Sequence, residues 1–158
     1  MDKIILPELK IIAHAQNDFT SSFGVPRQSG LATNVTKIVF EPEYCKECIL
    51  KGLEEFSHLW VLWIFSGDVG KEWSPTVRPP KLGGNVRKGV FATRSPMRPN
   101  PIGLSSVKIL SISASGKNQY IEVEGADLIN GTPIIDVKPY VPYCDCHADA
   151  LGGFSDPE

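Results

Sequence analysis

The sequence contains 158 residues, of which 42% are hydrophobic and 22% are charged, and its formal net charge is −2. This composition predicts one globular domain with a core of its own, and the weak negative charge argues against a strongly basic nucleic-acid binder. No apolar run reaches the roughly 18 residues that a membrane span needs, and the N-terminus lacks a signal-peptide cleavage pattern. We therefore expect a cytoplasmic protein with no membrane partner.

Strand patterns account for most of the chain. In order, segments rich in β-branched and aromatic residues predict strands over residues 10–13, 35–41, 58–65, 103–114, 119–126 and 134–138. The fourth alternates polar residues with Val107, Ile109 or Leu110, and Ile112, as a half-buried strand does. Residues 115–118 (Ser-Gly-Lys-Asn) predict the hairpin loop that follows it. Because helices do not alternate with these strands, the expected fold is mainly β, an antiparallel barrel or sandwich.

One helix and two long loops complete the predicted organisation. Apolar side chains recur at helical spacing over residues 45–56 and predict a short helix whose apolar face consists of Cys45, Ile49, Leu53 and Phe56. Long loops are predicted over residues 16–34 and 66–88, and the second contains three prolines and two adjacent glycines. Loops of this length are commonly functional or disordered.

Basic side chains are concentrated in one part of the sequence. No Asp or Glu occurs between Trp73 and Ile121, so all 18 acidic residues lie elsewhere. The same stretch contains eight of the 16 basic residues, namely Arg78, Lys81, Arg87, Lys88, Arg94, Arg98, Lys108 and Lys117. Such segregation favours an anionic partner, although a solvated basic surface would give the same pattern.

Residues 94–101, Arg-Ser-Pro-Met-Arg-Pro-Asn-Pro, form the most unusual segment of the basic stretch. Proline fixes φ and removes a backbone donor, so the segment predicts a rigid loop rather than a helix or a central strand. Polar clusters also occur at residues 24–28, 56–60 and 127–133. Singly, each has a structural explanation, such as the turn that Asn130-Gly131 predicts. Together they suggest a site built from rigid loops on a β scaffold.

The four cysteines form two short pairs. Cys45 and Cys48 are spaced C-x-x-C, whereas Cys144 and Cys146 are spaced C-x-C and precede His147. Closely spaced thiolates can hold zinc, but 95 residues separate the pairs and the first lies in the predicted helix. Disulfides are disfavoured in the cytosol. Ordinary thiols and no bound metal are therefore expected.

Five segments, "FGVPRQSGL", "GLEEFSHLWVLWIF", "TVRPPKLGGN", "GVFATRSPMRPNPIGLS" and "GTPIIDVKPYVPYCD", resemble the TrmO (YaeB-like) family of S-adenosylmethionine-dependent tRNA methyltransferases. The resemblance covers about residues 11–145 and keeps the motifs in order. It implies a small single-sheet antiparallel β-barrel with one or two short helices and long functional loops. We expect one such domain over residues 1–158, with no additional C-terminal domain. The absence of a Gly-rich nucleotide motif agrees with this non-Rossmann fold.

The resemblance also implies a reaction, a cofactor and partners. The reaction is methylation of N6 of threonylcarbamoyladenosine in the tRNA anticodon loop, with S-adenosylmethionine as the methyl donor. Family members act as homodimers with the cofactor site near the subunit interface. By position, the cofactor contacts fall on Pro26, Arg27, Gln28, His58, Leu59, Arg94, Leu104, Asp127, Asn130, Gly131 and Thr132.

Further residues are candidates for the acceptor side of the reaction. Arg94 could hold the cofactor carboxylate with two hydrogen bonds, which leaves Arg98 for RNA phosphate unless a nearby acid pairs with it. Substrate contacts are also expected from Lys81, Arg87 and Lys88. The candidates for positioning the base and handling its proton are Asp136, Lys138, Tyr140 and Tyr143, which could equally be a packed strand end.

Two other classes of function remain open from the residues alone. A non-catalytic RNA-binding β-barrel would use the same basic loop, with exposed aromatic rings for stacking at Trp60, Trp63 and Trp73. A metal-binding interaction module would be built on the cysteines. Binding of S-adenosylmethionine separates the methyltransferase from both.

Overall fold

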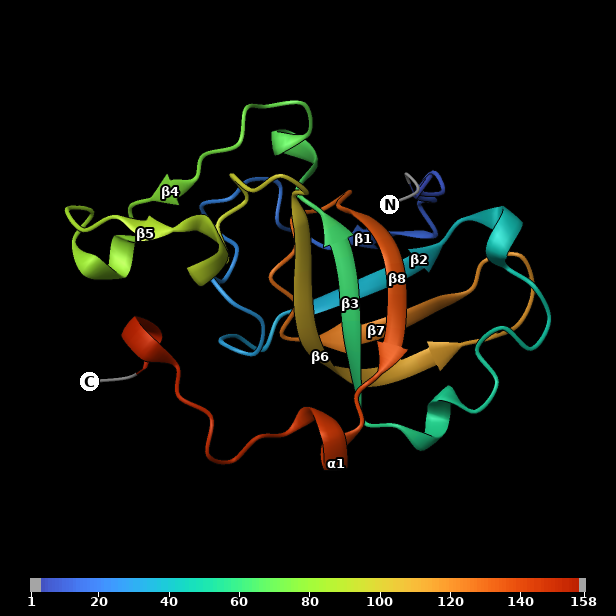
Figure 1. Cartoon of the computed structure of the whole chain (residues 1–158). Coiled ribbons are helices and arrows are strands. Elements are labelled where there is room, and N and C mark those ends of the chain that lie inside the picture. The colour runs from blue at the N-terminus through green and yellow to red at the C-terminus, as the bar shows by residue number, and fades with distance from the viewer. Residues whose placement is uncertain (1–3, 157–158) are drawn as a thin grey trace.

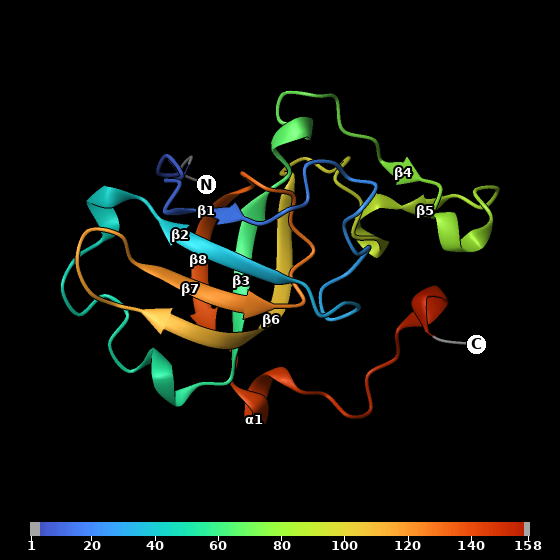
Figure 2. The ribbon, with the colours of Figure 1, turned by 180° about the vertical axis from the view of Figure 1, so that it is seen from behind.

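Six strands close into an antiparallel β-barrel in the computed structural model, which describes residues 4–156. Around the barrel the order is β1-β2-β7-β6-β3-β8. The bounds of these strands are Ala13–Gln16 (β1), Val35–Phe40 (β2), His58–Ile64 (β3), Ile102–Ser113 (β6), Tyr120–Glu124 (β7) and Pro133–Pro139 (β8). Figures 1 and 2 show the barrel from opposite sides. The predicted antiparallel barrel is confirmed, and the sandwich alternative is wrong.

Alternation along the strands places one face of each in the core. Leu59, Val61 and Trp63 of β3 are buried, and they belong to the same core cluster as Ile121 and Val123 of β7. Each fully buried side chain of this size contributes about 1.5–3 kcal/mol relative to an exposed one. The mixture of β-branched and aromatic residues therefore both favours the strands and fills their interior.

β1 lies three residues later than predicted. Its buried side chains are Ala13 and Ala15, and alanine has little strand propensity, so the alternation is hard to see in the sequence.

The structure of β6 explains why its sequence left open whether Ile109 or Leu110 continues the alternation. Its pairing with β7 shifts register between Ile109 and Ser111, so one residue is left over where the alternation was unclear.

Glycine is required at position 103 by close packing. In β6, a Cβ atom added to Gly103 would lie 2.2 Å from the ring of Trp63. Trp63 is 7% exposed and packs against Phe65 with the ring centroids 4.3 Å apart. The missing side chain on one strand thus makes room for an aromatic ring on the next.

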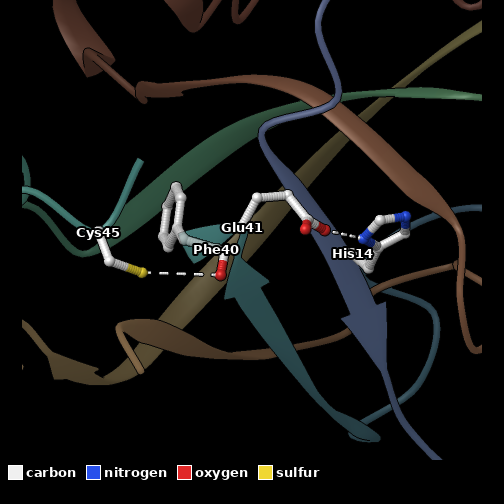
Figure 3. A network of polar contacts seen from close by, with 4 residues as sticks. All are labelled: His14, Phe40, Glu41 and Cys45. Atoms are coloured by element: carbon white, nitrogen blue, oxygen red, sulfur yellow. Dashed lines mark hydrogen bonds and ion pairs between the residues drawn. The ribbon is translucent and has the colours of Figure 1, made fainter. Parts of the chain in front are cut away.

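A seam between the first and last strands closes the barrel. β1 pairs with β8 through only two residue pairs, Ala13 with Ile134 and His14 with Pro133. On its other side β1 pairs with β2 along its whole length. Figure 3 shows the His14 Nδ1 atom against the Glu41 carboxylate just beyond β2, and the Cys45 thiol directed at the Phe40 carbonyl at 3.7 Å. These contacts join β1 to the end of β2 and to the segment that follows.

The helix predicted over residues 45–56 is wrong. Cys48 and Gly52 have φ values of +65° and +86°, which an α-helix does not accommodate. Successive turns replace the helix, and Leu50 is the residue that enters the core. Among residues 4–156, one short α-helix, Pro142–Asp145 (α1), occurs elsewhere. The 3₁₀ turns are Pro42–Tyr44, Leu53–Glu55, Ser66–Asp68, Pro80–Leu82, Val90–Ala92 and Gly153–Ser155.

A small hairpin projects from one end of the barrel, and we call residues 74–90 the basic arm. It contains β4 (Thr76–Val77) paired with β5 (Lys88–Gly89), so the long loop predicted over residues 66–88 is interrupted by two short strands. The chain's C-terminal segment reaches this arm (Figure 1). There the Lys81 ammonium donates to the carbonyls of Ser155 and Asp156, at 2.8 and 2.5 Å.

None of the helices among residues 4–156 has the length and apolar character that a bilayer crossing requires.

Candidate functional site

A cavity of about 990 Å³ lies at the end of the barrel where β3 finishes and β6 begins. Ile64 and Ile102 pair there, so the chain leaving β3 and the chain entering β6 form adjacent walls. Three loops complete the lining: residues 25–28, residues 91–100 and residues 127–132. In Figure 1 this end of the barrel faces the basic arm. Segments far apart in the sequence thus meet because the barrel brings their flanking strands together.

The proline-rich loop places two guanidinium groups in the cavity wall with different surroundings. Arg94 Nη1 donates to the side-chain oxygen of Gln28 at 2.6 Å, which joins this loop to the loop of residues 25–28. Arg98 Nη1 donates to the carbonyls of Thr93 and Ser95, at 2.9 and 3.4 Å. Arg98 therefore stabilises its own loop, whereas Arg94 is held by an amide that a stronger acceptor can displace.

Asp127 supplies a negative charge to the same cavity. Its carboxylate accepts a hydrogen bond from the Ser105 hydroxyl at 2.5 Å, and that hydroxyl accepts one from the Trp63 indole at 2.9 Å. Burial raises the pKa of Asp127 above its ordinary value. The Ser105 hydrogen bond, backbone amides and the charge of Arg94 act in the opposite direction. A guanidinium and a carboxylate thus face one space.

Ten of the residues predicted to bind cofactor or substrate meet at this cavity. They are Pro26, Arg27, Gln28, Arg94, Arg98, Leu104, Asp127, Asn130, Gly131 and Thr132. The turn predicted at Asn130-Gly131 is present, with φ of +84° at the glycine and a hydrogen bond from Thr132 N to Ile129 O. The sequence therefore indicated three of the loops that line the cavity.

His58 and Leu59 do not line the cavity. They begin β3, whereas the cavity lies beyond its other end, about 20 Å away at the rise of an extended strand. Leu59 is 0% exposed and belongs to the core. The β3 side of the cavity is formed instead by the segment from Trp63 to Asp68, including Ser66 and Gly67, which the sequence reading missed. The antiparallel pairing of β3 with β6 is the signal that could have indicated these residues.

The four catalytic candidates also lie away from the cavity. Lys138 and Asp136 form an ion pair of 2.8 Å on β8, which raises the pKa of Lys138. Tyr140 packs against Trp60 with ring centroids 5.5 Å apart, and desolvation raises its pKa. Tyr143 is 91% exposed on α1. Lys138, Tyr140 and Tyr143 lie toward the opposite end of the barrel, where β3 begins and β8 ends, whereas Asp136 pairs with Leu62 in the middle of β8.

The arm carries the remaining basic candidates, outside the cavity. Arg87 Nη1 donates to the Thr76 hydroxyl at 2.8 Å, and the Lys88 ammonium lies 5.9 Å from the centre of the Phe154 ring. Lys81 binds the C-terminal carbonyls described above. In the described part of the chain no acidic side chain forms an ion pair with these three residues.

In the described residues, the tryptophans do not form an exposed stacking surface and the cysteines do not form a metal site. Of the three tryptophans expected to be exposed, only Trp73 is, at 54%. Trp63 is buried, and the Trp60 indole donates to the Asp145 carboxylate at 2.8 Å. The four cysteines are free thiols. Within residues 4–156 no group of three His, Cys, Asp or Glu side chains is arranged to hold a metal ion.

Comparison with known proteins gives one consistent family. Residues 14–146 match the family model of the tRNA-methyltransferase O N-terminal domain. The tRNA (adenine(37)-N6)-methyltransferase of Escherichia coli is 40% identical over 141 residues, which are 89% of this chain and 60% of that protein. An S-adenosyl-L-methionine-binding protein of Archaeoglobus fulgidus is 36% identical over 138 residues, covering 87% of this chain and 92% of that protein.

A solved structure agrees in fold as well as in sequence. The crystal structure of TrmO from Pseudomonas aeruginosa superposes with a TM-score of 0.79 at 34% identity, over 98% of this chain and 65% of that one. The chain thus spans about three fifths of the length of the Escherichia coli relative. The match of the family model over most of the chain, together with this superposition, shows that the protein belongs to the tRNA-methyltransferase O family.

Proposed function

We propose that the cavity binds S-adenosylmethionine. Its volume of about 990 Å³ is at the upper end of the roughly 300–1,000 Å³ that small-molecule sites occupy. The cofactor carries a carboxylate and two positive groups, and the cavity offers Arg94 for the first and Asp127 for the others. Relatives named as S-adenosylmethionine-dependent or S-adenosyl-L-methionine-binding proteins support the same ligand. On the β3 side, we place the contacts at Ser66 and Gly67 in preference to His58 and Leu59.

We further propose that the chain acts in methylation of N6 of adenosine 37 in tRNA, the reaction for which its relatives are named. The cofactor, when bound, supplies an activated methyl group. The contribution of the chain is alignment, because holding donor and acceptor at near-contact distance can provide much of the acceleration. The proline-rich loop suits that task, because its prolines fix backbone angles and so reduce the entropy lost when the loop is ordered around a ligand.

The acceptor that we propose is the threonylcarbamoyl form of the adenosine. Its N6 is a poor nucleophile, because the ureido carbonyl and the purine ring both delocalise the lone pair. It also brings a carboxylate, which an exposed arginine or lysine can bind. The basic arm borders the cavity end of the barrel and would contact the phosphates of the anticodon loop through Lys81, Arg87 and Lys88. The absence of facing acidic partners in the described structure supports this assignment.

A homodimer is proposed for the same reaction. Within one chain, none of Asp136, Lys138, Tyr140 and Tyr143 lines the cavity, and the last three lie toward the far end of the barrel. In a dimer whose cofactor site lies near the interface, these side chains of one protomer could approach the cavity of its partner. Mixing Arg94→Ala chains with Tyr140→Ala chains tests the arrangement. Recovery of activity in the mixture would support sites shared between protomers. Activity no higher than the two variants show separately would place each site within one chain.

The decisive experiment compares two RNA substrates. Radiolabelled methyl transfer is measured on tRNA that carries the threonylcarbamoyl group and on an unmodified transcript of the same sequence, and nucleoside mass spectrometry locates the product. We expect labelling of the modified tRNA and little of the transcript, because polar groups that bind the threonylcarbamoyl moiety stay unpaired without it. Equal labelling of both would refute the proposed acceptor. Labelling of neither, with cofactor binding confirmed by calorimetry, would point to another substrate or to a missing partner, whereas no cofactor binding would favour the non-catalytic RNA-binding alternative.

A further inference from the structure

A buried hydroxyl connects the cavity to the interior of the barrel. Ser105 lies on β6, is 0% exposed, and has a hydrogen-bond partner on each side. The Trp63 indole from β3 donates to Ser105 Oγ at 2.9 Å, and the same oxygen donates to Asp127 Oδ1 at 2.5 Å. The three side chains come from two strands and one loop. Trp63, Ser105 and Asp127 thus form one continuous series of hydrogen bonds.

The direction of these hydrogen bonds is fixed by their chemistry. An indole nitrogen can only donate, so the Trp63 contact must use a lone pair of the serine oxygen. The single hydroxyl proton is then left for Asp127, the acceptor on the other side. A buried donor aimed at a carboxylate favours its charged form, whereas burial alone favours the neutral acid. The Ser105 hydroxyl therefore opposes the effect of burial on the pKa of Asp127.

Packing leaves Ser105 little freedom to do otherwise. Gly103, two residues earlier on the same face of β6, has no side chain, and the ring of Trp63 occupies that space. The indole is thus held where its nitrogen reaches Ser105. The other charged groups at the cavity are Arg27, Arg94, Arg98 and Asp68, of which Asp68 pairs with Lys71 at 3.1 Å. Among them, the charge of Arg94 acts directly on Asp127.

We propose that Ser105 is a positioning residue of the site, whose hydroxyl, aligned by Trp63, keeps the Asp127 carboxylate charged and oriented to receive a cationic ligand. The proposal rests on the cofactor site proposed above and specifies its chemistry. The cavity then offers fixed charges of both signs, which suits a ligand with an amino-acid head and an onium centre. Without the hydroxyl, Asp127 would take up a proton at a higher pH and lose its attraction for a cation.

A titration of the free protein tests the first half of the proposal. Carbon-13 NMR follows the Asp127 carboxyl with pH in the wild type, in Ser105→Ala and in Trp63→Phe. We expect the titration midpoint of Asp127 to rise in Ser105→Ala, and to rise less in Trp63→Phe, which keeps the hydroxyl but removes its alignment. Ser106→Ala, on the opposite face of β6, is the matched control and should leave the midpoint unchanged. Equal midpoints in wild type and Ser105→Ala would overturn the proposal.

Calorimetry with S-adenosylmethionine tests the second half. We expect Ser105→Ala to weaken binding about tenfold at a pH between the two Asp127 midpoints that the NMR titration gives for wild type and variant, and no more than about threefold well above both. A merely structural role of Ser105 would weaken binding equally at both pH values, and that result would overturn the positioning role. If the wild type does not bind S-adenosylmethionine at all, the proposed cofactor is refuted, while the NMR titration still decides whether Ser105 controls Asp127. Should Ser105→Ala not fold, Trp63→Phe carries both measurements.

Discussion

The two ends of the barrel look alike in the sequence and differ in the structure. Both combine a strand terminus with prolines, aromatic rings and charged side chains. At the cavity end these groups surround a space of about 990 Å³, and charges of opposite sign face it. Toward the far end Trp60 and Tyr140 pack together, Lys138 pairs with Asp136 of the middle of β8, and Asp145 accepts a hydrogen bond from the Val141 amide at the start of α1. The side chains of Trp60, Lys138 and Asp145 already have partners within the chain, so the density of motif residues at that end does not by itself indicate a site.

The largest effect expected from this comparison comes from the packing below the cavity. Gly103→Ala places a methyl group 2.2 Å from the Trp63 ring, where it must displace part of the core. We expect a loss of about 3 kcal/mol in the free energy of unfolding, the upper end of the usual cost of overpacking. Urea unfolding measures it. Gly89→Ala, where an added methyl group meets nothing within 4 Å, is the control and should change little.

A side-chain truncation at each end tests which one binds the cofactor. Arg94→Ala should weaken S-adenosylmethionine binding by about 1.5–3 kcal/mol, the range of hydrogen bonds to charged groups. His58→Ala, at the start of β3, should leave the affinity unchanged if the site lies within one chain. Calorimetry on both variants decides. An effect of His58→Ala as large as that of Arg94→Ala would mean that the far end of a partner subunit completes the cavity.

RNA binding should depend on the arm beside the cavity end. Replacing Lys81, Arg87 and Lys88 together with alanine should reduce the slope of log affinity against log salt by about two to three, since each phosphate contact contributes roughly 0.9. Filter binding of tRNA at several salt concentrations measures the slope. The control is a triple variant with the same change in charge on other parts of the chain, in which alanine replaces Lys10, Lys46 and Lys51. If both variants give the wild-type slope, the RNA surface lies elsewhere.

The smallest effect concerns the cap of α1 at the far end. The Val141 amide and the Trp60 indole donate to Asp145, and these hydrogen bonds lower its pKa below the ordinary value of 3.8. A lowered pKa stabilises the fold above 3.8 and loses that stabilisation as the pH falls further. Asp145→Asn should therefore reduce the thermal midpoint slightly at pH 7 and not near pH 2. Asp149→Asn removes an exposed carboxylate and is the control, which should leave the thermal midpoint at pH 7 unchanged.

Regular features of the fold were predictable from the sequence, whereas exceptions to backbone regularity were not. The strands around Leu59 and Ile121 follow from clear alternation of β-branched and aromatic residues. The false helix arose because Cys45, Ile49 and Leu53 have helical spacing, while the left-handed conformation of Cys48, a non-glycine residue, leaves no mark in the sequence. β1 was displaced because alanine, which fills its inward positions, is not a typical strand residue.

Residues of the site were predictable where their loop has a distinctive local sequence. Prolines marked the loop of Arg94, and Asn130-Gly131 marked a turn. Ser66 and Gly67 have no such signal and line the cavity only because β3 pairs with β6. The hydrogen bonds through Ser105 were equally invisible, since a serine within an alternating strand looks like a surface residue. Contacts that depend on strand register need the register to be known first.

The two-residue seam between β1 and β8 has a consequence for how the protein is made. Ala13 and Ile134 are about 120 residues apart, so this pairing has one of the longest sequence separations in the molecule. During synthesis β1 can pair with β2 early, but the barrel cannot close until β8 has left the ribosome. Folding rates fall as such non-local pairings increase. The final step of folding is therefore expected to be the closure of this short seam, and hydrogen exchange should show it opening more often than the long β3–β6 pairing.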